Sequence, residues 1–351
     1  MSGEAREAET DPGLLARALS PAGLSSEEAG RLAAGLCANR YPPAFAGALL
    51  SALATRGETV DELYGFATAL RSMARAFPPP GAAEGVDLCG TGGASHPTFN
   101  VSTVAAFVVA AAGGPVVKHG NTSVRGPCGS SDLLEALGLP ITTSVEFPTE
   151  SFRKESLAFL HAPLFHQATK NVAPLRKSLG IRTIFNQLGP LTNPAAPKYQ
   201  VVGAYSVDYG RKAVEVLSRL NCTTVLAVHG DAGTDELSPK EPSTLLLQGP
   251  HGLSMERFLP EELLAPEERE GSWEPLPPPK AAAEAEAILR GSSRGARYGA
   301  VLLTAGAALW IMDRAPGLEE GVAVAREMIA SGRALSKLET LRALAKSRDW
   351  G

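Results

Sequence analysis

The hydrophobic periodicity of the chain changes once, near residue 82, and this change constrains the fold more than any other feature. From Pro12 to Phe77, leucine and alanine recur at the spacing of amphipathic helices. Ser25 and Thr59 each precede acidic residues, as helix N-caps do, and the run PPPG at 78–81 ends this block. Beyond it, short β-prone runs such as GVDLC, GPVVKH, YQVVGAYSV and TTVLAVHG alternate with helical ones. The sequence therefore predicts a small all-helical domain followed by a larger α/β domain with a central, mainly parallel sheet.

Composition and charge limit the class of protein. The chain has 351 residues, 44% hydrophobic and 20% charged, as in an ordinary globular protein of roughly two domains. Its net charge of -4 gives no reason to expect a nucleic-acid partner, and its longest apolar runs are shorter than a membrane span. The four cysteines lie far apart, which indicates reduced thiols. We therefore expect a cytoplasmic protein that binds neither nucleic acid nor membrane, with residues 1–12 as a disordered tail.

The stretch GTGGASHPTFNVST, residues 90–103, joins the apolar run VDLC to the apolar run VAAFVVAAA. A strand, a glycine-rich turn and a helix in this order present free backbone N–H groups to an anion. Hydroxyl groups that can bind phosphate or a metal ion follow in the same stretch, on Thr91, Thr98, Ser102 and Thr103. The stretch predicts a phosphate-binding loop, with a tight turn and helix caps as the alternative.

A second stretch, VVKHGNTSVRGPCGSSDLLEALG at 116–138, repeats the order of strand, glycine-rich loop and helix. It adds polar and basic side chains at Lys118, His119, Asn121 and Arg125. Two such loops can face one polyphosphate, so the second stretch strengthens the interpretation of the first.

Adjacent carboxylates follow a third predicted strand. The run TTVLAVHG is followed by DAGTDELS, which contains Asp235 and Glu236. Ligands of open α/β sheets bind beyond the carboxyl ends of the strands, and Mg²⁺ takes few protein oxygens and completes its shell with water and phosphate. A solvated acidic turn is the alternative, but two phosphate loops in the same sheet favour a magnesium site.

The longest recognisable motif is NVAPLRKSLGIRTIFNQLGPLTNPA, residues 171–195. Together with GTGG before TFNVST, KHGN, GSSDLLEALG and HGDAGTDE, it closely resembles the anthranilate phosphoribosyltransferase family of tryptophan biosynthesis. The resemblance covers nearly the whole chain. Nucleoside phosphorylases of the same fold carry a different first loop and match less well.

The resemblance implies how the domains are organised. Residues 13–81, joined by about 171–195, would form a helical domain hinged to an α/β domain made of 82–170 and 196–351. The resemblance also implies a homodimer formed through the helical part.

The resemblance further implies the reaction and the residues that support it. The amine of anthranilate would attack C1 of phosphoribosyl pyrophosphate, with Mg²⁺ bound and pyrophosphate released. Magnesium would be bound by Ser102, Asp235 and Glu236. Arg176 would take the anthranilate carboxylate as a charge-assisted pair, and His119 would lie beside the acceptor. The other implied substrate-binding residues are Gly90, Gly93, Thr98, Asn100, Ser102, Thr103, Lys118, Gly120, Asn121, Arg125 and Ser130.

This chemistry needs no general base, because an aryl amine is neutral and nucleophilic at pH 7. Catalysis is then charge neutralisation of the leaving pyrophosphate together with positioning of the amine. No catalytic acid or base is therefore predicted, and His161 and His166 are interpreted as core or hinge-packing residues.

Two departures from the family pattern lie in the phosphate loops. Ala94 stands where the family has an aspartate, and the Thr122–Cys128 loop differs from the usual serine-rich run. Two alternatives therefore stay open: a diverged phosphoribosyltransferase that uses another aromatic amine or heterocycle, and a paralogue that binds ligand without turnover. Retention of the ligand-binding set argues against the second alternative, namely Lys118, Asn121, Arg176, Asp235 and Glu236.

Overall fold

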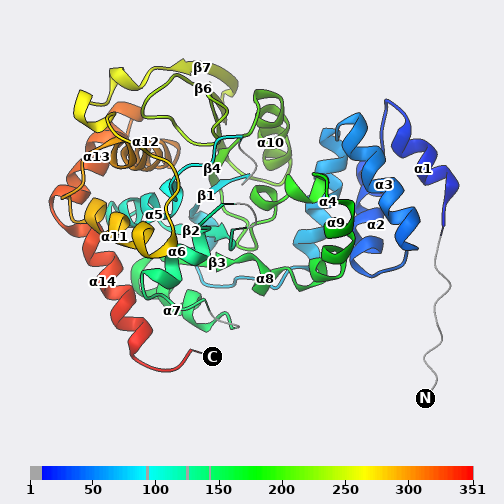
Figure 1. Ribbon diagram of the computed structural model, residues 1–351, viewed down its shortest axis with the longest axis horizontal. Helices are drawn as coiled ribbons and strands as arrows, with labels where there is room; N and C mark the ends of the chain where they lie inside the picture. Colours follow the sequence, from blue (N-terminus) through cyan, green and yellow to red (C-terminus); the bar gives the residue numbers. More distant parts are fainter. Residues whose placement is uncertain (1–9, 92–94, 124–125, 142–143, 351) are drawn as a thin grey trace.

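The computed structural model describes residues 10–91, 95–123, 126–141 and 144–350. It consists of a large α/β lobe and a small helical lobe (Figure 1). Residues 1–9 of the expected disordered tail lie outside the described residues, as do Gly93, Ala94 and Arg125.

The small lobe is built from the predicted N-terminal helices, α1 (Pro12–Leu19), α2 (Ser26–Cys37), α3 (Pro43–Arg56) and α4 (Val60–Met73). The predicted helix caps at Ser25 and Thr59 are confirmed. Each hydroxyl accepts a hydrogen bond from the backbone N–H three residues later, and a glutamate at that position completes a capping box. At Gly65 of α4 a β-carbon would lie 2.2 Å from the Ser26 carbonyl oxygen, so α2 and α4 pack with their backbones close together.

A distant segment of the chain packs against these helices. It contains α9 (Ala173–Leu179) and the 3-10 turns η2 (Gln167–Val172), η3 (Ile184–Asn186) and η4 (Gly189–Leu191). Phe185 meets the ring of Phe66 edge to face at 5.7 Å, and Ile184 and Leu191 share the same apolar cluster. In Figure 1 this segment lies beside α4.

Within the described residues the strands form one sheet of order β3-β2-β1-β4-β5-β6-β7. Neighbours from β3 to β5 are parallel, whereas β6 and β7 pair antiparallel. The predicted mainly parallel sheet is therefore confirmed. The strands are β1 (Val86–Gly90), β2 (Val116–Gly120), β3 (Leu157–His161), β4 (Tyr199–Gly203), β5 (Thr224–Gly230), β6 (Ser243–Gly249) and β7 (Gly252–Phe258). Four of them, β1, β2, β4 and β5, coincide with the predicted strands, and the other three are not predicted by the sequence pattern.

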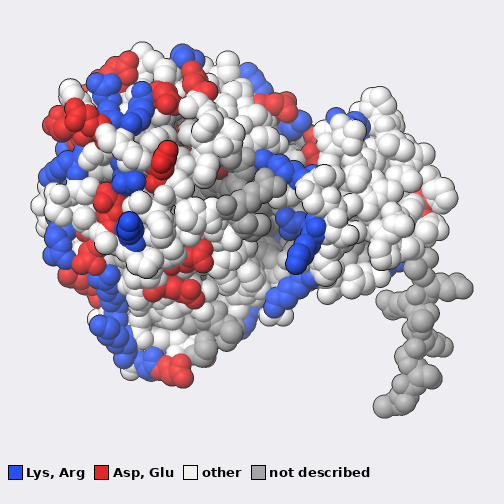
Figure 2. Space-filling model, viewed as in Figure 1, with Lys and Arg blue, Asp and Glu red and all other residues white. Residues whose placement is uncertain are grey.

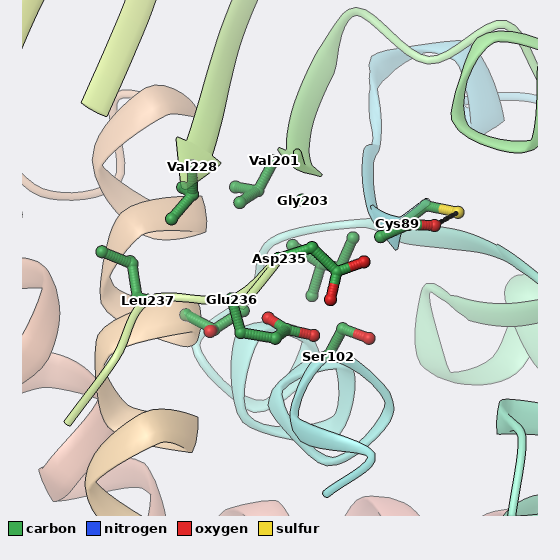
Figure 3. Close-up of a pocket in the computed structure, with 11 residues that line it drawn as sticks. Cys89, Ser102, Val201, Gly203, Val228, Asp235, Glu236 and Leu237 are labelled. Carbon is green, nitrogen blue, oxygen red and sulfur yellow. Dashed lines mark hydrogen bonds between the residues drawn. The ribbon is translucent and has the colours of Figure 1, made fainter. Parts of the chain in front are cut away.

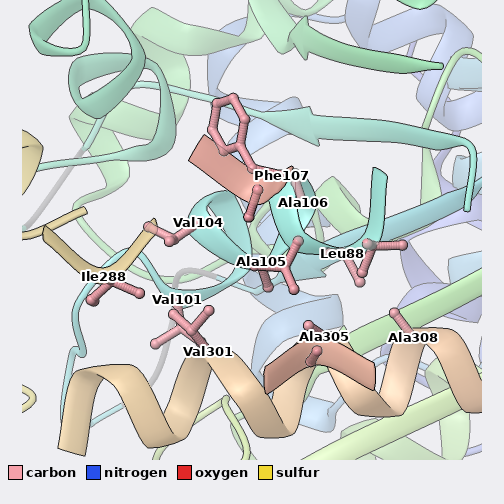
Figure 4. Packing of buried hydrophobic residues seen from close by; sticks show 14 of the residues in the cluster. Leu88, Val101, Val104, Ala105, Ala106, Phe107, Ile288, Val301, Ala305 and Ala308 are labelled. Atoms are coloured by element: carbon pink, nitrogen blue, oxygen red, sulfur yellow. The ribbon is translucent and has the colours of Figure 1, made fainter. Parts of the chain in front are cut away.

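Helices cover both faces of the sheet. On one face α5 packs against α12, where Val101 and Ala105 face Val301 and Ala305 in one apolar cluster (Figure 4). On the other face α10 packs between the sheet and α4 of the small lobe. The helices of the large lobe are α5 (Val101–Ala111), α6 (Ser130–Ala136), α7 (Glu146–Glu155), α8 (Ala162–Phe165), α10 (Val207–Arg219), α11 (Pro278–Leu289), α12 (Ala296–Ile311), α13 (Leu318–Ala330) and α14 (Arg333–Lys346).

A buried carboxylate fixes the 171–195 segment to the sheet. Asp87 of β1 accepts hydrogen bonds from the Asn193 amide at 2.8 Å and from the His119 backbone N–H at 3.0 Å. The same Asn193 amide also donates to the Val117 carbonyl oxygen at 2.7 Å. Burial raises the pKa of Asp87 to about 6, although Lys118 and these hydrogen bonds oppose the rise. This network holds the motif recognised in the sequence against β1 and β2.

None of the helices in the described ranges combines the length and the apolar character that a membrane crossing requires.

Candidate active site

Three glycines lie at the carboxyl ends of neighbouring strands: Gly120 of β2, Gly90 of β1 and Gly203 of β4. A β-carbon added at Gly120 would lie 2.2 Å from the Ser130 hydroxyl, and one added at Gly203 would lie 1.9 Å from the Asp235 carbonyl oxygen. At Gly90 it would lie 2.9 Å from the Asp235 carboxylate. Only glycine therefore allows two loops to lie directly over the strand ends, at the point where the strand order reverses.

The loop that contains Asp235 and Glu236, here called the acidic loop, lies over β1 and β4. The Asp235 carboxylate accepts a hydrogen bond from the Thr91 hydroxyl at 3.0 Å. Glu236 accepts one from the backbone N–H of Ser102, in the first turn of α5. Figure 3 shows the two carboxylates and the Ser102 hydroxyl converging on one small pocket, which Gly90, Gly203 and Thr304 also line.

The two adjacent carboxylates of this pocket favour the binding of a cation. Burial and the neighbouring charge of Asp235 raise the pKa of Glu236 to about 8, and Lys118 lowers it only in part. The described residues contain no cluster of three or more histidine, cysteine or carboxylate ligands. Two carboxylates and one hydroxyl fit Mg²⁺, which retains several waters, better than they fit Zn²⁺. The residues present therefore fit the predicted magnesium site.

Unmatched polar atoms surround the first turn of α5. Among the described residues, Asn100 Oδ1 and Thr103 Oγ1 are buried and have no hydrogen-bond partner. The Asn100 amide donates to the Cys128 carbonyl oxygen at 3.1 Å and so connects the first loop to the second. Thr98, just before this turn, is half-buried. Buried polar atoms are rarely left unmatched, so these atoms indicate a ligand.

The second loop lies over β2. Lys118 is only 3% exposed, and its ammonium donates to the Leu88 carbonyl oxygen of β1. The Ser130 hydroxyl accepts from the Asn121 backbone N–H and donates to the Asn121 carbonyl oxygen, each at 3.1 Å. A buried ammonium thus lies beside a loop of hydroxyl and backbone groups, as the binding of a phosphate requires.

Two buried histidines, His119 and His166, contact each other. The rings of His119 and His166 contact edge to face with centroids 5.2 Å apart, and the Nε2 atom of each has no partner among the described residues. His119 Nδ1 lies 3.1 Å from the Gly189 carbonyl oxygen. Burial lowers the pKa of His119 to about 3 and that of His166 to about 4, so both rings are neutral at pH 7. His166 is buried, as expected, but its unmatched nitrogen adds it to the candidate site.

Arg176 lies apart from the strand ends, on α9. Its guanidinium lies 5.5 Å from the centre of the Phe185 ring, and partial burial lowers its pKa. Within the described residues Arg176 forms neither an ion pair nor a hydrogen bond with the predicted site residues at the strand ends. Figure 2 shows Lys and Arg side chains beside the hollow between the two lobes, next to α9, which carries Arg176 and Lys177 in its last turn. The structure therefore places Arg176 on the small-lobe side, apart from the other predicted site residues at the strand ends.

Comparison with known proteins agrees with this architecture. The family described as "Glycosyl transferase family, a/b domain" matches residues 82–335, and "Glycosyl transferase family, helical bundle domain" matches residues 12–74. Anthranilate phosphoribosyltransferase of Desulfosudis oleivorans is 41% identical over 338 residues, which is 95% of this chain and 98% of that protein. The Chloroflexus aurantiacus enzyme is 40% identical, over 92% of this chain and 95% of its own.

Solved structures agree as well. The crystal structure of anthranilate phosphoribosyltransferase from Thermus thermophilus superposes with a TM-score of 0.86 at 37% identity, covering 95% of this chain and 99% of that one. The Saccharomyces cerevisiae enzyme, solved in complex with phosphoribosyl pyrophosphate and magnesium, shares the fold with a TM-score of 0.84 at 24% identity, covering 96% of this chain and 98% of that chain. By its sequence and its fold, this chain belongs to the anthranilate phosphoribosyltransferase family.

Proposed function

We propose that this enzyme transfers the phosphoribosyl group of phosphoribosyl pyrophosphate to the amine of anthranilate, giving N-(5-phosphoribosyl)anthranilate and pyrophosphate in tryptophan biosynthesis. The observation that carries the proposal is the row of glycines at the strand ends. The acidic loop lies over β1 and β4 at this row, and the buried Lys118 belongs to β2. This arrangement fits a ligand with a magnesium-bound pyrophosphate and a second phosphate.

The donor would lie along this row. Ser102, Asp235 and Glu236 would hold Mg²⁺, and the ion would neutralise the leaving pyrophosphate. Lys118 and Ser130 would contact the phosphates, with Asn121 between donor and acceptor. The remaining predicted contacts to ribose and pyrophosphate would come from Gly90, Thr98, Asn100, Thr103 and Gly120.

The acceptor would enter from the small lobe. Arg176 offers a planar pair of donors for the anthranilate carboxylate. The unmatched Nε2 atoms of His119 and His166 are neutral, so they can bind the acceptor's polar groups without adding charge. The chain then supplies position and hydrogen bonds, because the aryl amine needs no deprotonation before it attacks.

We also propose the predicted division of the chain, with 171–195 joining helical residues 13–81, and a homodimer formed through that lobe. Leu19 of α1 is 62% exposed, and the visible face of the small lobe carries few charged side chains (Figure 2). The four cysteines are free, which fits a cytoplasmic enzyme.

Loss of anthranilate fluorescence on mixing with phosphoribosyl pyrophosphate and Mg²⁺ tests the function directly. Donor-dependent and magnesium-dependent loss is expected. If the donor is consumed only with another aromatic amine, the acceptor assignment is wrong and the diverged transferase is the better interpretation. If the donor binds but is never consumed, the chain is a ligand-binding paralogue.

A further inference from the structure

A serine and a histidine outside the proposed donor contacts form a hydrogen bond at the end of the edge strand β3. Ser131 Oγ lies 2.8 Å from His161 Nδ1. Ser131 is the second residue of α6 and is 2% exposed, and His161 is the last residue of β3. The bond therefore joins the start of α6 to a strand of the sheet.

The position of His161 continues the glycine row. In the parallel register His161 pairs with Gly120, so it stands one strand beyond the proposed phosphate end of the site. One pocket is lined by Lys118, Gly120, Ser130, Ser131 and His161. The imidazole thus faces the same space as the ammonium and the hydroxyl assigned to the donor.

The other side of the imidazole is apolar. His161 also lines an adjoining pocket with Leu134, Phe147 and Phe159. Burial lowers the pKa of His161, and the nearby charge of Asp132 only partly opposes this change. Apolar side chains therefore lie on this side of the ring, and the serine hydroxyl is the hydrogen-bond partner of its Nδ1 atom.

Ser131 in turn fixes the second loop. Its backbone N–H donates to the Asn121 carbonyl oxygen at 3.1 Å, and the neighbouring Ser130 hydroxyl bonds both backbone groups of Asn121. Because the Ser130 hydroxyl would lie 2.2 Å from a β-carbon at Gly120, it has little room to move toward the sheet. A shift of Ser131 would therefore displace Ser130 and Asn121 together.

We propose that His161 is a positioning residue for the donor: by holding Ser131 it sets the placement of Ser130 and Asn121 at the phosphate end of the site. The role rests on the proposed function. It is distinct from the interpretation of His161 as a packing residue, because a packing residue would be replaceable by any ring of similar size.

The test compares three variants of the full-length enzyme. His161→Phe keeps a ring but removes the hydrogen bond, Ser131→Ala removes its partner, and His161→Asn keeps an amide near the position of Nδ1. Calorimetric titration with phosphoribosyl pyrophosphate and Mg²⁺ should show donor binding weakened about two- to tenfold in the first two variants, the range for one lost hydrogen bond. His161→Asn should bind the donor nearly as the natural enzyme does.

Steady-state kinetics and a control variant separate positioning from a general structural effect. The KM for the donor should rise more than the KM for the acceptor in His161→Phe, because Ser130 would contact only the donor, while kcat stays unchanged. His229→Phe is the matched control, because His229 of β5 bonds the Ala204 carbonyl oxygen at 2.8 Å and not a donor loop. It should leave donor affinity unchanged.

The outcomes are separable. If the natural enzyme binds the donor and both His161→Phe and Ser131→Ala bind it equally well, the positioning role is wrong and the proposed function stands. The role is also wrong if His161→Asn loses as much donor affinity as His161→Phe although thermal unfolding shows that its fold is intact. If the natural enzyme does not bind the donor at all, the proposed function and this inference fall together.

Discussion

The helices α5 and α9 bring the two halves of the site into place in opposite ways. Ten of the eleven residues of α5 are buried, so Ser102 in its first turn is held by the core of the large lobe. All residues of α9 are described and none is buried, although this helix carries Arg176. The proposed metal-binding side is thus fixed by the sheet and its covering helices, and the proposed acceptor side is fixed by surface packing on the small lobe.

The difference in burial predicts a difference in tolerance. At the strand ends, a displacement of one loop meets atoms of its neighbour, as the close approach of Asp235 to Gly90 and Gly203 indicates. At α9, by contrast, a β-carbon added at Gly47 of α3 would lie at ordinary contact distances from Leu175 and Leu179. Substitutions at the donor end should therefore cost more than substitutions at the acceptor end.

The largest effect is expected from the paired carboxylates. Exchanging Asp235 for Asn together with Glu236 for Gln keeps size but removes the charge proposed to bind Mg²⁺, so kcat/KM should fall by about a hundredfold or more. Turnover across a Mg²⁺ series, with thermal unfolding to show the fold intact, is the measurement. Asp231→Asn is the control, since Asp231 lies in the same loop but pairs with Arg257. Full activity of the double variant at limiting Mg²⁺ would exclude the metal role.

The second-largest effect is expected at Gly203, where a substitution changes the available space and not the charge. In Gly203→Ala the new methyl group would lie 1.9 Å from the Asp235 carbonyl oxygen, so the acidic loop must move. Overpacking of this kind costs about 1 to 3 kcal/mol, and we expect donor binding in Mg²⁺ to weaken about tenfold or more. Gly249→Ala in the same sheet is the control, because its nearest neighbour would lie 3.8 Å away. Unchanged donor binding would mean that the loop position does not matter for the site.

A smaller effect is expected on the acceptor side. Arg176→Lys keeps the charge but loses the two-pronged fork, so the acceptor KM should rise about tenfold, as for one lost charge-assisted hydrogen bond. The donor KM should stay the same. Lys177→Gln, at the exposed neighbouring position, provides the comparison. If Arg176→Lys leaves the acceptor KM unmoved, no carboxylate binds there and a different aromatic acceptor becomes the better assignment.

Local features of the fold are predicted from the sequence, whereas features set by distant residues are not. Helix caps at Ser25 and Thr59 and the runs that form β1, β2, β4 and β5 are local signals, and the structure confirms them. The strand β3 escapes prediction because LAFLH follows a helical run without a turn and contains no β-branched residue. The antiparallel strands β6 and β7 escape it too, since their pairing is set by tertiary contacts.

Polar pairs that span the chain explain the remaining misses. Asp87 and Asn193 meet although they are 106 residues apart, and Ser131 and His161 meet across 30 residues. A single sequence gives no signal for such pairs, because each residue alone also fits a solvated turn or a packed core. Asp235 and Glu236 are accessible to prediction because they are adjacent and follow a strand.

The smallest effect is expected at an ion pair that joins the lobes. Arg219 of α10 bonds Asp61 of α4 at 2.7 Å, and both side chains are substantially exposed, at 42% and 54%. Such pairs contribute less than about 1 kcal/mol and weaken with salt. Two links between the small lobe and the 171–195 segment are less accessible to water: the Gln187 amide donates to Glu58 at 2.6 Å, and the Arg71 guanidinium donates to the Leu191 carbonyl oxygen at 2.9 Å.

A double-mutant cycle with Arg219→Ala and Asp61→Ala, measured by denaturant unfolding at low and high salt, tests this ranking. The coupling should stay below about 1 kcal/mol and shrink as salt rises, and both KM values should be unaltered. Gln187→Leu leaves the buried Glu58 carboxylate without its amide and should destabilise the protein more than either exposed substitution. A coupling of several kcal/mol at Arg219, or an acceptor KM that follows it, would mean that the arrangement of the lobes depends on this surface pair. The acceptor side would then be held by charge and would be more sensitive to salt than the donor side.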